Sequence, residues 1–386
     1  PTCFVHSRIV PSSMVRPHLG RITSWAMVPP SVRSDHGAHR RHDVEILELA
    51  GRHWKWRMHG GAVTLARRFL AGGYRPDVVL ASDMIDLGAF LALTRKVTAG
   101  VPAAVYFHEN QLTYPWSPKD RDRRRAWDRH YGFINFVSAL TSDRVLFNSR
   151  FHMDSFLEAL PVFLRKFPDH QELERVAFIR EKCEVLPLGF DLRSLDVPET
   201  ETAPEHPRPL VVWNHRWEYD KNPGDFFAAL RVVAGRGRAF DLALVGEVFD
   251  VVPKPFRDAA AEFGDRIVHS GYVENRGEYA AWLRRSHILP VTSDQDFFGG
   301  SVMEAMYCRC HPILPRRLAY PELLAGERYA DCFYGEFDEL VEKLDSAIRN
   351  FRSLPTDHLR AAACRYDWKE MAPRYDRRLL ALRRGE

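Results

Sequence analysis

Short apolar runs alternate with helical patterns along the first half of the chain. The strand-like runs are DVEILEL (43–49), PDVVLAS (76–82), AAVYFH (103–108), RVLFNS (144–149) and CEVLPLGF (183–190). The helical patterns between them are HGGAVTLARRFL (59–70), IDLGAFLALTRKV (85–97), FHMDSFLEAL (151–160) and ELERVAFIREK (172–182). Such alternation predicts parallel strands joined by crossover helices, which is the pattern of an α/β fold.

A proline-rich segment, residues 196–209, separates this half from a second one. It holds four prolines and no periodic apolar face, so we expect an interdomain linker. The alternation then restarts with the strand-like runs PLVVWN (209–214), FDLALVG (240–246), RIVHSGYV (266–273), HILPVTS (287–293) and HPILP (311–315). We therefore expect two doubly wound, Rossmann-like domains, residues 1–195 and 210–365, facing each other across a cleft.

The two ends of the chain depart from this pattern. Residues 366–386 predict a helical segment, in which Pro373 should start a new turn or bend the helix. Residues 1–42 are rich in proline and show no clear strand followed by a glycine-rich turn. This atypical start predicts that the first domain lacks the opening strand of its fold.

Composition narrows the class of protein. The chain has 386 residues, 45% hydrophobic and 27% charged, which is ordinary for a folded soluble protein. No stretch approaches the ~18 consecutive apolar residues of a membrane span, and no signal peptide is evident near the start. The six cysteines are scattered, so we expect reduced thiols, a cytoplasmic location and no stable membrane association. Cys308 and Cys310 lack further ligands at zinc spacing and are predicted to be packing residues.

The segment SDQDFFGGSVMEAM (293–306) carries the strongest local signal. Gly299 and Gly300 introduce a helix after a buried strand, and amides at a helix N-terminus favour a phosphate. Asp296 and Glu304 could each accept hydrogen bonds from neighbouring sugar hydroxyls. The alternative is a helix cap followed by an exposed glutamate.

A second signal is WNHRWEYDKNP (213–223), which follows the first strand of the second half. Arg216 and Lys221 could together neutralise a diphosphate, the leaving group of a sugar nucleotide. Alternatively, the loop is solvated and Glu218 and Asp220 are ion-pair partners of the two cations.

Two polar stretches of the first half are candidates for the remaining chemistry. HENQ, residues 108–111, lies at the carboxyl end of an apolar run, where parallel sheets bind ligands, although a loop histidine is often structural. KDRDRRRAWDRHYGF (119–133) places arginines beside aromatic residues, a combination that recognises RNA phosphates and unstacked bases. The interleaved aspartates also fit a solvated helix face.

Several of these segments carry a resemblance. WNHRWEYDKNP, GYV (271–273) and the spacing of Asp296 and Glu304 resemble retaining glycosyltransferases of the GT-B fold, in the sugar-nucleotide family that includes mannosyltransferases. Four segments show a narrower resemblance, to the tRNA-queuosine alpha-mannosyltransferase family. They are AGRHWKWRMHG (50–60), YFHENQLTYP (106–115), FNSRFHMDSFL (147–157) and FFGGSVMEAMYCRCHPILP (297–315). The resemblance covers roughly residues 43–386.

The resemblance implies a reaction: mannose passes from GDP-mannose to queuosine in tRNA for aspartate, without a cofactor or an obligatory metal. The resemblance implies that the donor ribose is held by Glu304 and the donor diphosphate by Arg216, Lys221, Phe298, Gly299 and Gly300. It implies that the catalytic residues are His108, Glu109 and Asp296, the last at a position where glutamate is usual. It implies that the acceptor RNA is contacted by Asn110, Gln111, Arg121, Arg123, Arg124 and Arg125.

Two other functions fit the same residues. The sugar could pass to a lipid or polysaccharide, or the protein could bind nucleotide sugar or RNA without turnover. Retention of configuration could come from a covalent carboxylate intermediate or from attack on the same face guided by the leaving phosphate, and we favour the second route.

Overall fold

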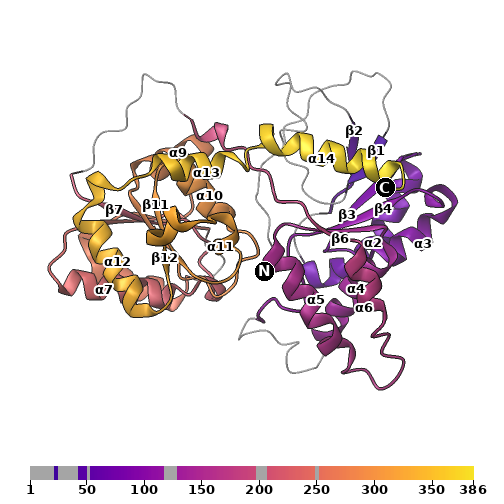
Figure 1. Cartoon of the computed structure of the whole chain (residues 1–386), viewed down its shortest axis with the longest axis horizontal. Coiled ribbons are helices and arrows are strands. Elements are labelled where there is room, and N and C mark those ends of the chain that lie inside the picture. Colours follow the sequence, from indigo (N-terminus) through magenta and orange to yellow (C-terminus); the bar gives the residue numbers. More distant parts are fainter. Residues whose placement is uncertain (1–20, 25–41, 50–52, 117–127, 197–206, 248–251) are drawn as a thin grey trace. The chain divides into compact units, whose positions relative to one another are not determined.

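The computed structural model describes residues 21–24, 42–49, 53–116, 128–196, 207–247 and 252–386 (Figure 1). The chain forms two compact units. Unit 1 consists of residues 1–188 and 371–386, and unit 2 of residues 189–370.

The sheet of unit 1 has six parallel strands in the order β2-β1-β3-β4-β5-β6. Their bounds are β1 Arg21–Ser24, β2 Asp43–Ile46, β3 Val78–Ser82, β4 Ala103–Phe107, β5 Arg144–Phe147 and β6 Cys183–Val185. The helices of this unit are α2 Trp54–Ala71, α3 Leu87–Thr98, α4 Asp128–Thr141, α5 Arg150–Leu164 and α6 Arg175–Glu181. The predicted parallel α/β organisation of this half is confirmed.

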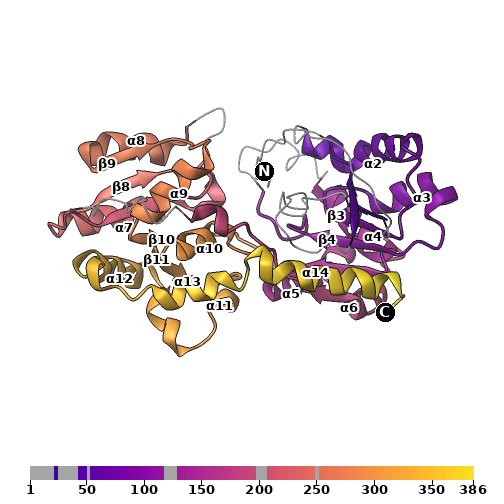
Figure 2. The same ribbon diagram turned by 90° about the horizontal axis from the view of Figure 1, so that it is seen from above.

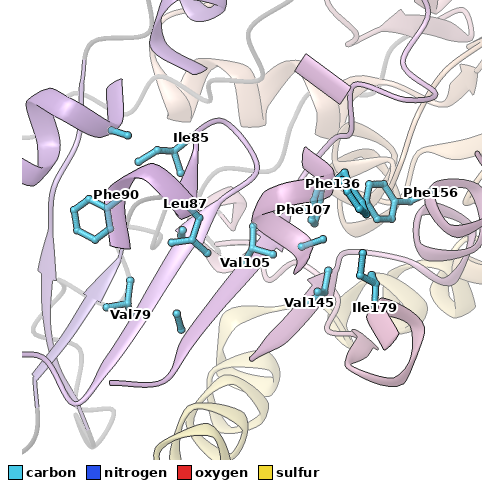
Figure 3. Packing of buried hydrophobic residues seen from close by; sticks show 14 of the residues in the cluster. Val79, Ile85, Leu87, Phe90, Val105, Phe107, Phe136, Val145, Phe156 and Ile179 are labelled. Carbon is cyan, nitrogen blue, oxygen red and sulfur yellow. The ribbon is translucent and has the colours of Figure 1, made fainter. Parts of the chain in front are cut away.

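Both faces of the unit 1 sheet are covered by apolar side chains. Helices α2 to α6 pack on one face, where Figure 3 shows Phe107, Phe136 and Phe156 beside Val105 and Val145. The last helix, α14 Trp368–Arg383, lies on the opposite side of the sheet from α4, α5 and α6 (Figure 1). Because successive strand residues point to opposite faces, strands buried on both faces require the continuous apolar runs seen in the sequence.

The prediction that residues 1–42 lack an opening strand is wrong. Strand β1 lies inside the sheet, with Ile22 opposite Val44 of β2 on one side and opposite Val78 of β3 on the other. Its sequence, RITS, has no apolar run that would predict a strand. Pairing with two neighbours defines this strand, and such long-range pairing is not encoded in the local pattern.

The division between the units differs from the predicted boundary at 195. The segment after residue 188 belongs to unit 2, where the Phe190 N–H donates to Tyr366 O (2.8 Å) and the Trp368 N–H donates to Phe190 O (2.9 Å). The segment 371–386 belongs to unit 1, because Tyr375 and Leu382 of α14 pack against that unit's sheet. Helix α14 continues through Pro373.

Unit 2 contains a second parallel sheet of six strands in the order β12-β11-β10-β7-β8-β9. The strands are β7 Leu210–Trp213, β8 Asp241–Leu244, β9 Ile267–Ser270, β10 Ile288–Pro290, β11 His311–Pro315 and β12 Phe333–Tyr334. The helices are α7 Pro223–Gly235, α8 Lys254–Phe263, α9 Arg276–Arg285, α10 Gly300–Tyr307, α11 Tyr320–Leu323, α12 Phe337–Arg349 and α13 Asp357–Cys364.

Helices of unit 2 lie on both sides of its sheet. Figure 1 shows α7 and α12 on one side and α9, α10 and α13 on the other, and Figure 2 shows α8 beside β9 at the edge. The core on the α7 and α12 side is built around Trp213, Phe226 and Phe227. Unit 2 is therefore doubly wound, as its sequence predicts.

Candidate active site

The loops after β7 and β10 lie at a topological switch point. The chain runs from β7 to β8 and β9 on one side and then returns to β10 on the other side of β7. Ligands of open α/β sheets bind beyond the carboxyl ends of the strands at such a point. The loop after β7 carries WNHRWEYDKNP and the loop after β10 carries SDQDFFGG, so the fold brings the two strongest motifs together.

Lys221 joins these two loops. Its Nζ donates to Gln295 O (2.7 Å), although the two residues are 74 positions apart. The same ammonium lies 3.2 Å from Asp220 Oδ2 and 3.7 Å from Asp296 Oδ2. Burial disfavours the ammonium, but the carboxylates of Asp296 and Asp220 outweigh burial and raise the pKa of Lys221. Lys221 therefore remains a cation at this position.

The Asp296 carboxylate is held by two hydrogen-bond donors and faces one ammonium group. Oδ1 accepts from the Phe298 N–H (3.1 Å), and Oδ2 accepts from the Tyr320 O–H (3.2 Å) and faces the Lys221 ammonium. Burial alone would raise the pKa of Asp296, but Lys221 and the Phe298 amide together lower it. Asp296 is therefore ionised and fixed in orientation.

The glycines that follow permit a close turn into α10. Gly299 has φ 96°, a left-handed conformation, and a Cβ there would lie 3.0 Å from Tyr320 Cε1. A Cβ on Gly300 would lie 2.8 Å from Phe190 Cε1. The amides at the start of α10 lie where the helix dipole favours an anion, and Gly299 O already accepts from Val302 and Met303.

Glu304 lies one turn into α10. Its Oε1 accepts from Arg276 Nη1 (2.8 Å) and its Oε2 accepts from the Tyr279 O–H (2.9 Å). Burial and Glu304 raise the pKa of Tyr279 well above its ordinary value, so the phenol keeps its proton. Asn214 Nδ2 donates to Tyr279 Oη (3.3 Å) and to Ser301 O (2.8 Å), which ties this group to the loop after β7.

His215 is buried beside these charges. Its Nδ1 lies 2.8 Å from Ser301 Oγ, and its Nε2 has no hydrogen-bond partner among the described residues. Burial, followed by the Lys221 charge, lowers the pKa of His215 to about 4. The ring is therefore neutral near neutral pH. It can exchange a hydrogen bond with Ser301, the second residue of α10.

The remaining predicted donor residues are also in unit 2. Arg216 Nη1 lies 3.2 Å from Glu218 Oε2, so the alternative ion pair of this loop is present. The Phe298 ring is buried against Phe190, with ring centroids 5.5 Å apart, and its N–H is bound to Asp296. Lys221, Asp296 and the start of α10 form one local group, to which Glu304 is joined through Asn214.

In unit 1, His108 follows β4 and lies against Asp83, the residue after β3. Asp83 Oδ1 accepts from the His108 N–H (3.0 Å) and lies 3.4 Å from its Nδ1. The His108 side chain is 14% exposed, whereas that of Asp83 is fully buried. Such a carboxylate orients the imidazole and leaves Nε2 for another partner.

The other residues of HENQ are buried. Gln111 Nε2 donates to Glu109 Oε1 (3.0 Å), and the Gln111 N–H donates to Asn135 Oδ1 (2.8 Å). Asn110 Oδ1 accepts from the N–H groups of Leu112 and Thr113, each at 3.0 Å. These side chains shape the loop that presents His108.

Some predictions fall on other parts of the chain. Arg121, Arg123, Arg124 and Arg125 lie outside the described residues. Cys308 and Cys310 are buried, and burial raises the pKa of Cys308 to about 12, so this thiol is protonated. Within the part of the chain that the structure describes, no helix is both long and apolar enough to cross a membrane.

Sequence reasoning missed several polar residues of these sites. Asp83 directly follows the buried run PDVVLAS, and that position could have indicated it. His215 lies within a segment that the sequence analysis singled out. Arg276 and Tyr279 belong to an ordinary helical pattern, and no local signal connects them with Glu304.

Comparison with solved structures identifies the fold. A sucrose-phosphate synthase from Thermosynechococcus elongatus has a TM-score of 0.67 at 12% identity, covering 95% of this chain and 100% of that one. Anabaena Alr3699/HepE in complex with UDP and glucose has a TM-score of 0.63 at 15% identity, covering 94% and 100%. These similarities show the two-domain GT-B fold, so the predicted fold class is confirmed.

The sequence comparisons are more specific. The sequence model of the protein family described as "tRNA-queuosine alpha-mannosyltransferase N-terminal" matches residues 31–190 of this chain. The tRNA-queuosine alpha-mannosyltransferase of Drosophila melanogaster is 33% identical over 314 residues, which is 80% of each chain. The chain belongs to the tRNA-queuosine alpha-mannosyltransferase family, as the resemblance predicts.

Proposed function

We propose that this chain transfers mannose from GDP-mannose to queuosine in tRNA for aspartate, with retention of configuration. The observation that carries the proposal is the 33% identity to the Drosophila tRNA-queuosine alpha-mannosyltransferase over four fifths of both chains. The reduced thiols that the sequence predicts fit a cytoplasmic enzyme.

The geometry of unit 2 supports a nucleotide-sugar donor. We assign the diphosphate to Lys221, Arg216 and the amides at the start of α10, beside Gly299 and Gly300. Loss of the sugar builds negative charge on the departing diphosphate, and fixed positive groups stabilise that charge without reorganising. Glu304, oriented by Arg276 and Tyr279, is assigned to the two ribose hydroxyls.

Asp296 is assigned to the hydroxyls of the donor sugar. Two hydrogen-bond donors and the Lys221 ammonium hold this carboxylate and its pKa is lowered, so it is a poor nucleophile. This supports attack on the same face, guided by the leaving phosphate, rather than a covalent intermediate on Asp296.

We assign His108 to catalysis as the contribution of unit 1, with Asp83 holding its imidazole. Glu109 is proposed to face a hydroxyl of donor or acceptor. The acceptor tRNA is assigned to unit 1, with Asn110 and Gln111 in the loop that carries His108. Arg121, Arg123, Arg124 and Arg125 are proposed to contact RNA phosphates.

The test is to incubate the protein with GDP-mannose and queuosine-containing tRNA, digest the RNA and weigh its nucleosides. We expect queuosine to gain one hexose, and to gain none from tRNA that carries guanosine in its place. EDTA should leave the transfer unchanged, and α-mannosidase should remove the sugar. A hexose on a lipid or glycan, with queuosine unmodified, would refute the proposed acceptor.

A further inference from the structure

The first turns of α2 carry a partly exposed surface that the residues assigned to the donor do not use. Its members are half-buried except Trp56 and His130, which are exposed. It consists of aromatic, imidazole and cationic side chains from α2, the loop after β4 and the start of α4. We name it the aromatic patch, and its residues are Trp54, Lys55, Trp56, Arg57, His59, Trp116 and His130.

Trp56 is the most exposed large hydrophobic side chain of the patch, at 68% exposure. Its indole lies over Gly60, one turn further along α2. A Cβ built on Gly60 would lie 2.7 Å from both Cε2 and Cζ2 of the indole. The glycine therefore makes room for the ring to lie along the helix. A large π surface remains in water, which is costly for an apolar group that has no partner.

A second flat surface is formed by two histidines. The rings of His59 and His130 are stacked with centroids 4.0 Å apart and an interplanar angle of 14°, and His130 Nε2 lies 2.7 Å from His59 Nδ1. Partial burial, followed by the neighbouring His130, lowers the pKa of His59. The short contact between the two ring nitrogens therefore joins the α2 ring to the α4 ring.

The patch also carries positive charge. Lys55 Nζ lies 5.8 Å from the Trp54 ring centroid and 5.3 Å from that of Trp116. Lys55 and Arg57 stand in the first turn of α2, and no acidic residue is present there. Cations at a helix N-terminus oppose the helix dipole, so their charge does not stabilise the helix itself.

The patch adjoins the loop that carries His108. Met84, the residue after Asp83, packs against the cluster of Met58 and Tyr131 beneath the patch, together with Trp54 and Trp116. Trp116 belongs to the same segment between β4 and α4 that begins with His108. A partner on the patch would therefore lie near the residue that we assign to catalysis.

We propose that the aromatic patch is the surface on which unpaired bases of the acceptor RNA stack, while Lys55 and Arg57 contact its phosphates. This inference rests on the proposed function. Bases of every kind stack on aromatic rings, and arginine and lysine neutralise the backbone. Helix α2 also exposes Val63 (60%) and Leu70 (47%), so binding to a membrane surface is the alternative that the vesicle measurement below tests.

The test compares RNA affinities of four variants by fluorescence anisotropy with queuosine-containing tRNA at three salt concentrations. Trp56→Ala should weaken binding by about 5- to 100-fold, as expected for one stacked base, and Trp56→Phe should restore most of it. Gly60→Ala should also weaken binding, because the new Cβ displaces the indole, while a helix interior gains stability from this change. The control is Phe178→Ala on α6, which removes another exposed ring (48%) and should leave affinity unchanged.

The charged residues are tested separately. Lys55→Ala combined with Arg57→Ala should reduce the slope of log affinity against log salt by about 1 to 1.5, whereas Trp56→Ala should leave the slope unchanged. Hydrolysis of GDP-mannose without acceptor should be unaffected by every patch variant.

Two outcomes separate this inference from the proposed function. If the wild-type protein adds hexose to queuosine but Trp56→Ala leaves the tRNA affinity and KM unchanged, the patch is not the RNA surface. If the wild-type protein adds no hexose to queuosine, the proposed function fails, whatever the variants bind. A third outcome would also overturn the inference. The wild-type protein would bind phosphatidylserine vesicles, and Trp56→Ala would lose that binding while its RNA affinity stayed unchanged.

Discussion

The loops after β7 and β10 of unit 2, which we assign to the donor, and the His108 loop of unit 1 all follow strands of a parallel sheet, but different interactions hold them. In unit 2, the ammonium of Lys221 lies between the carboxylates of Asp220 and Asp296. In unit 1, Asn110 and Gln111 hold the loop with neutral amide hydrogen bonds. Charges arranged in this way can exchange their partners for a charged ligand, whereas the amide network fixes a shape.

The largest expected effect is that of Lys221→Met. It removes the cation that we assign to the leaving group and leaves two carboxylates without their ammonium. We expect transfer to fall by about 10²- to 10³-fold and the unfolding free energy to fall by about 3 kcal/mol or more. Rates with saturating donor and urea unfolding measure the two effects.

Lys254→Met is the control for Lys221→Met, because Lys254 is an exposed lysine paired with Asp258 on α8. An exposed ion pair contributes little, so this variant should change neither quantity appreciably. Equal losses of transfer rate and unfolding free energy in the two lysine variants would contradict a special role for Lys221.

The next effect is a pH dependence of stability that arises from His215 in unit 2. The pKa of His215 is lowered from 6.5 to about 4. Between pH 6.5 and pH 4, this histidine is therefore protonated in the unfolded chain but neutral in the folded one. Stability is therefore lost as pH falls from 6.5 toward 4, by up to about 3 kcal/mol for this residue. His215→Gln should lose less stability than wild type between pH 7 and pH 5, as measured by urea unfolding.

His170→Gln, at an exposed histidine in unit 1, should keep the wild-type response. If His215→Gln loses as much stability in acid as wild type does, His215 is not a source of the acid sensitivity.

A smaller effect is expected from Glu304→Ala. It removes the carboxylate assigned to the ribose and takes a partner from Arg276 and Tyr279. Loss of two hydrogen bonds should raise the KM for donor by about 10- to 100-fold. Initial rates over a range of GDP-mannose concentrations measure the change. The control is Glu278→Ala, at an exposed glutamate of α9. A donor KM within twofold of wild type for Glu304→Ala would exclude the ribose assignment.

The smallest effect is expected in unit 1, from Asn110→Ala. The change leaves two amides of the loop without their acceptor, which should reduce the unfolding free energy by about 1 to 2 kcal/mol. The KM for donor should not change, because Asn110 belongs to the amide network. Asn350→Ala, at an exposed site in unit 2, should cost less stability. An altered donor KM in Asn110→Ala would contradict the separation of roles.

How much the sequence could predict differs between these regions. WNHRWEYDKNP and SDQDFFGG stood out locally, because glycines and charges after buried strands indicate a phosphate site before any coordinates are known. In HENQ the sequence correctly indicated a polar cluster, but it did not indicate which side chains are exposed and which are buried in the loop. Burial separates His108, which is partly exposed, from Asn110, which is fully buried.

The sequence by itself determined the alternation of strands and helices, the two-unit organisation and the two loop motifs that we assign to the donor, because these depend on local periodicity and residue type. Only the tertiary structure decided that RITS is an inner strand, that α14 belongs to unit 1 and that Asp83, His215, Arg276 and Tyr279 join the sites. Each of these depends on partners far away in the chain. Such pairing is fixed when strands and helices pack, and no local pattern carries it.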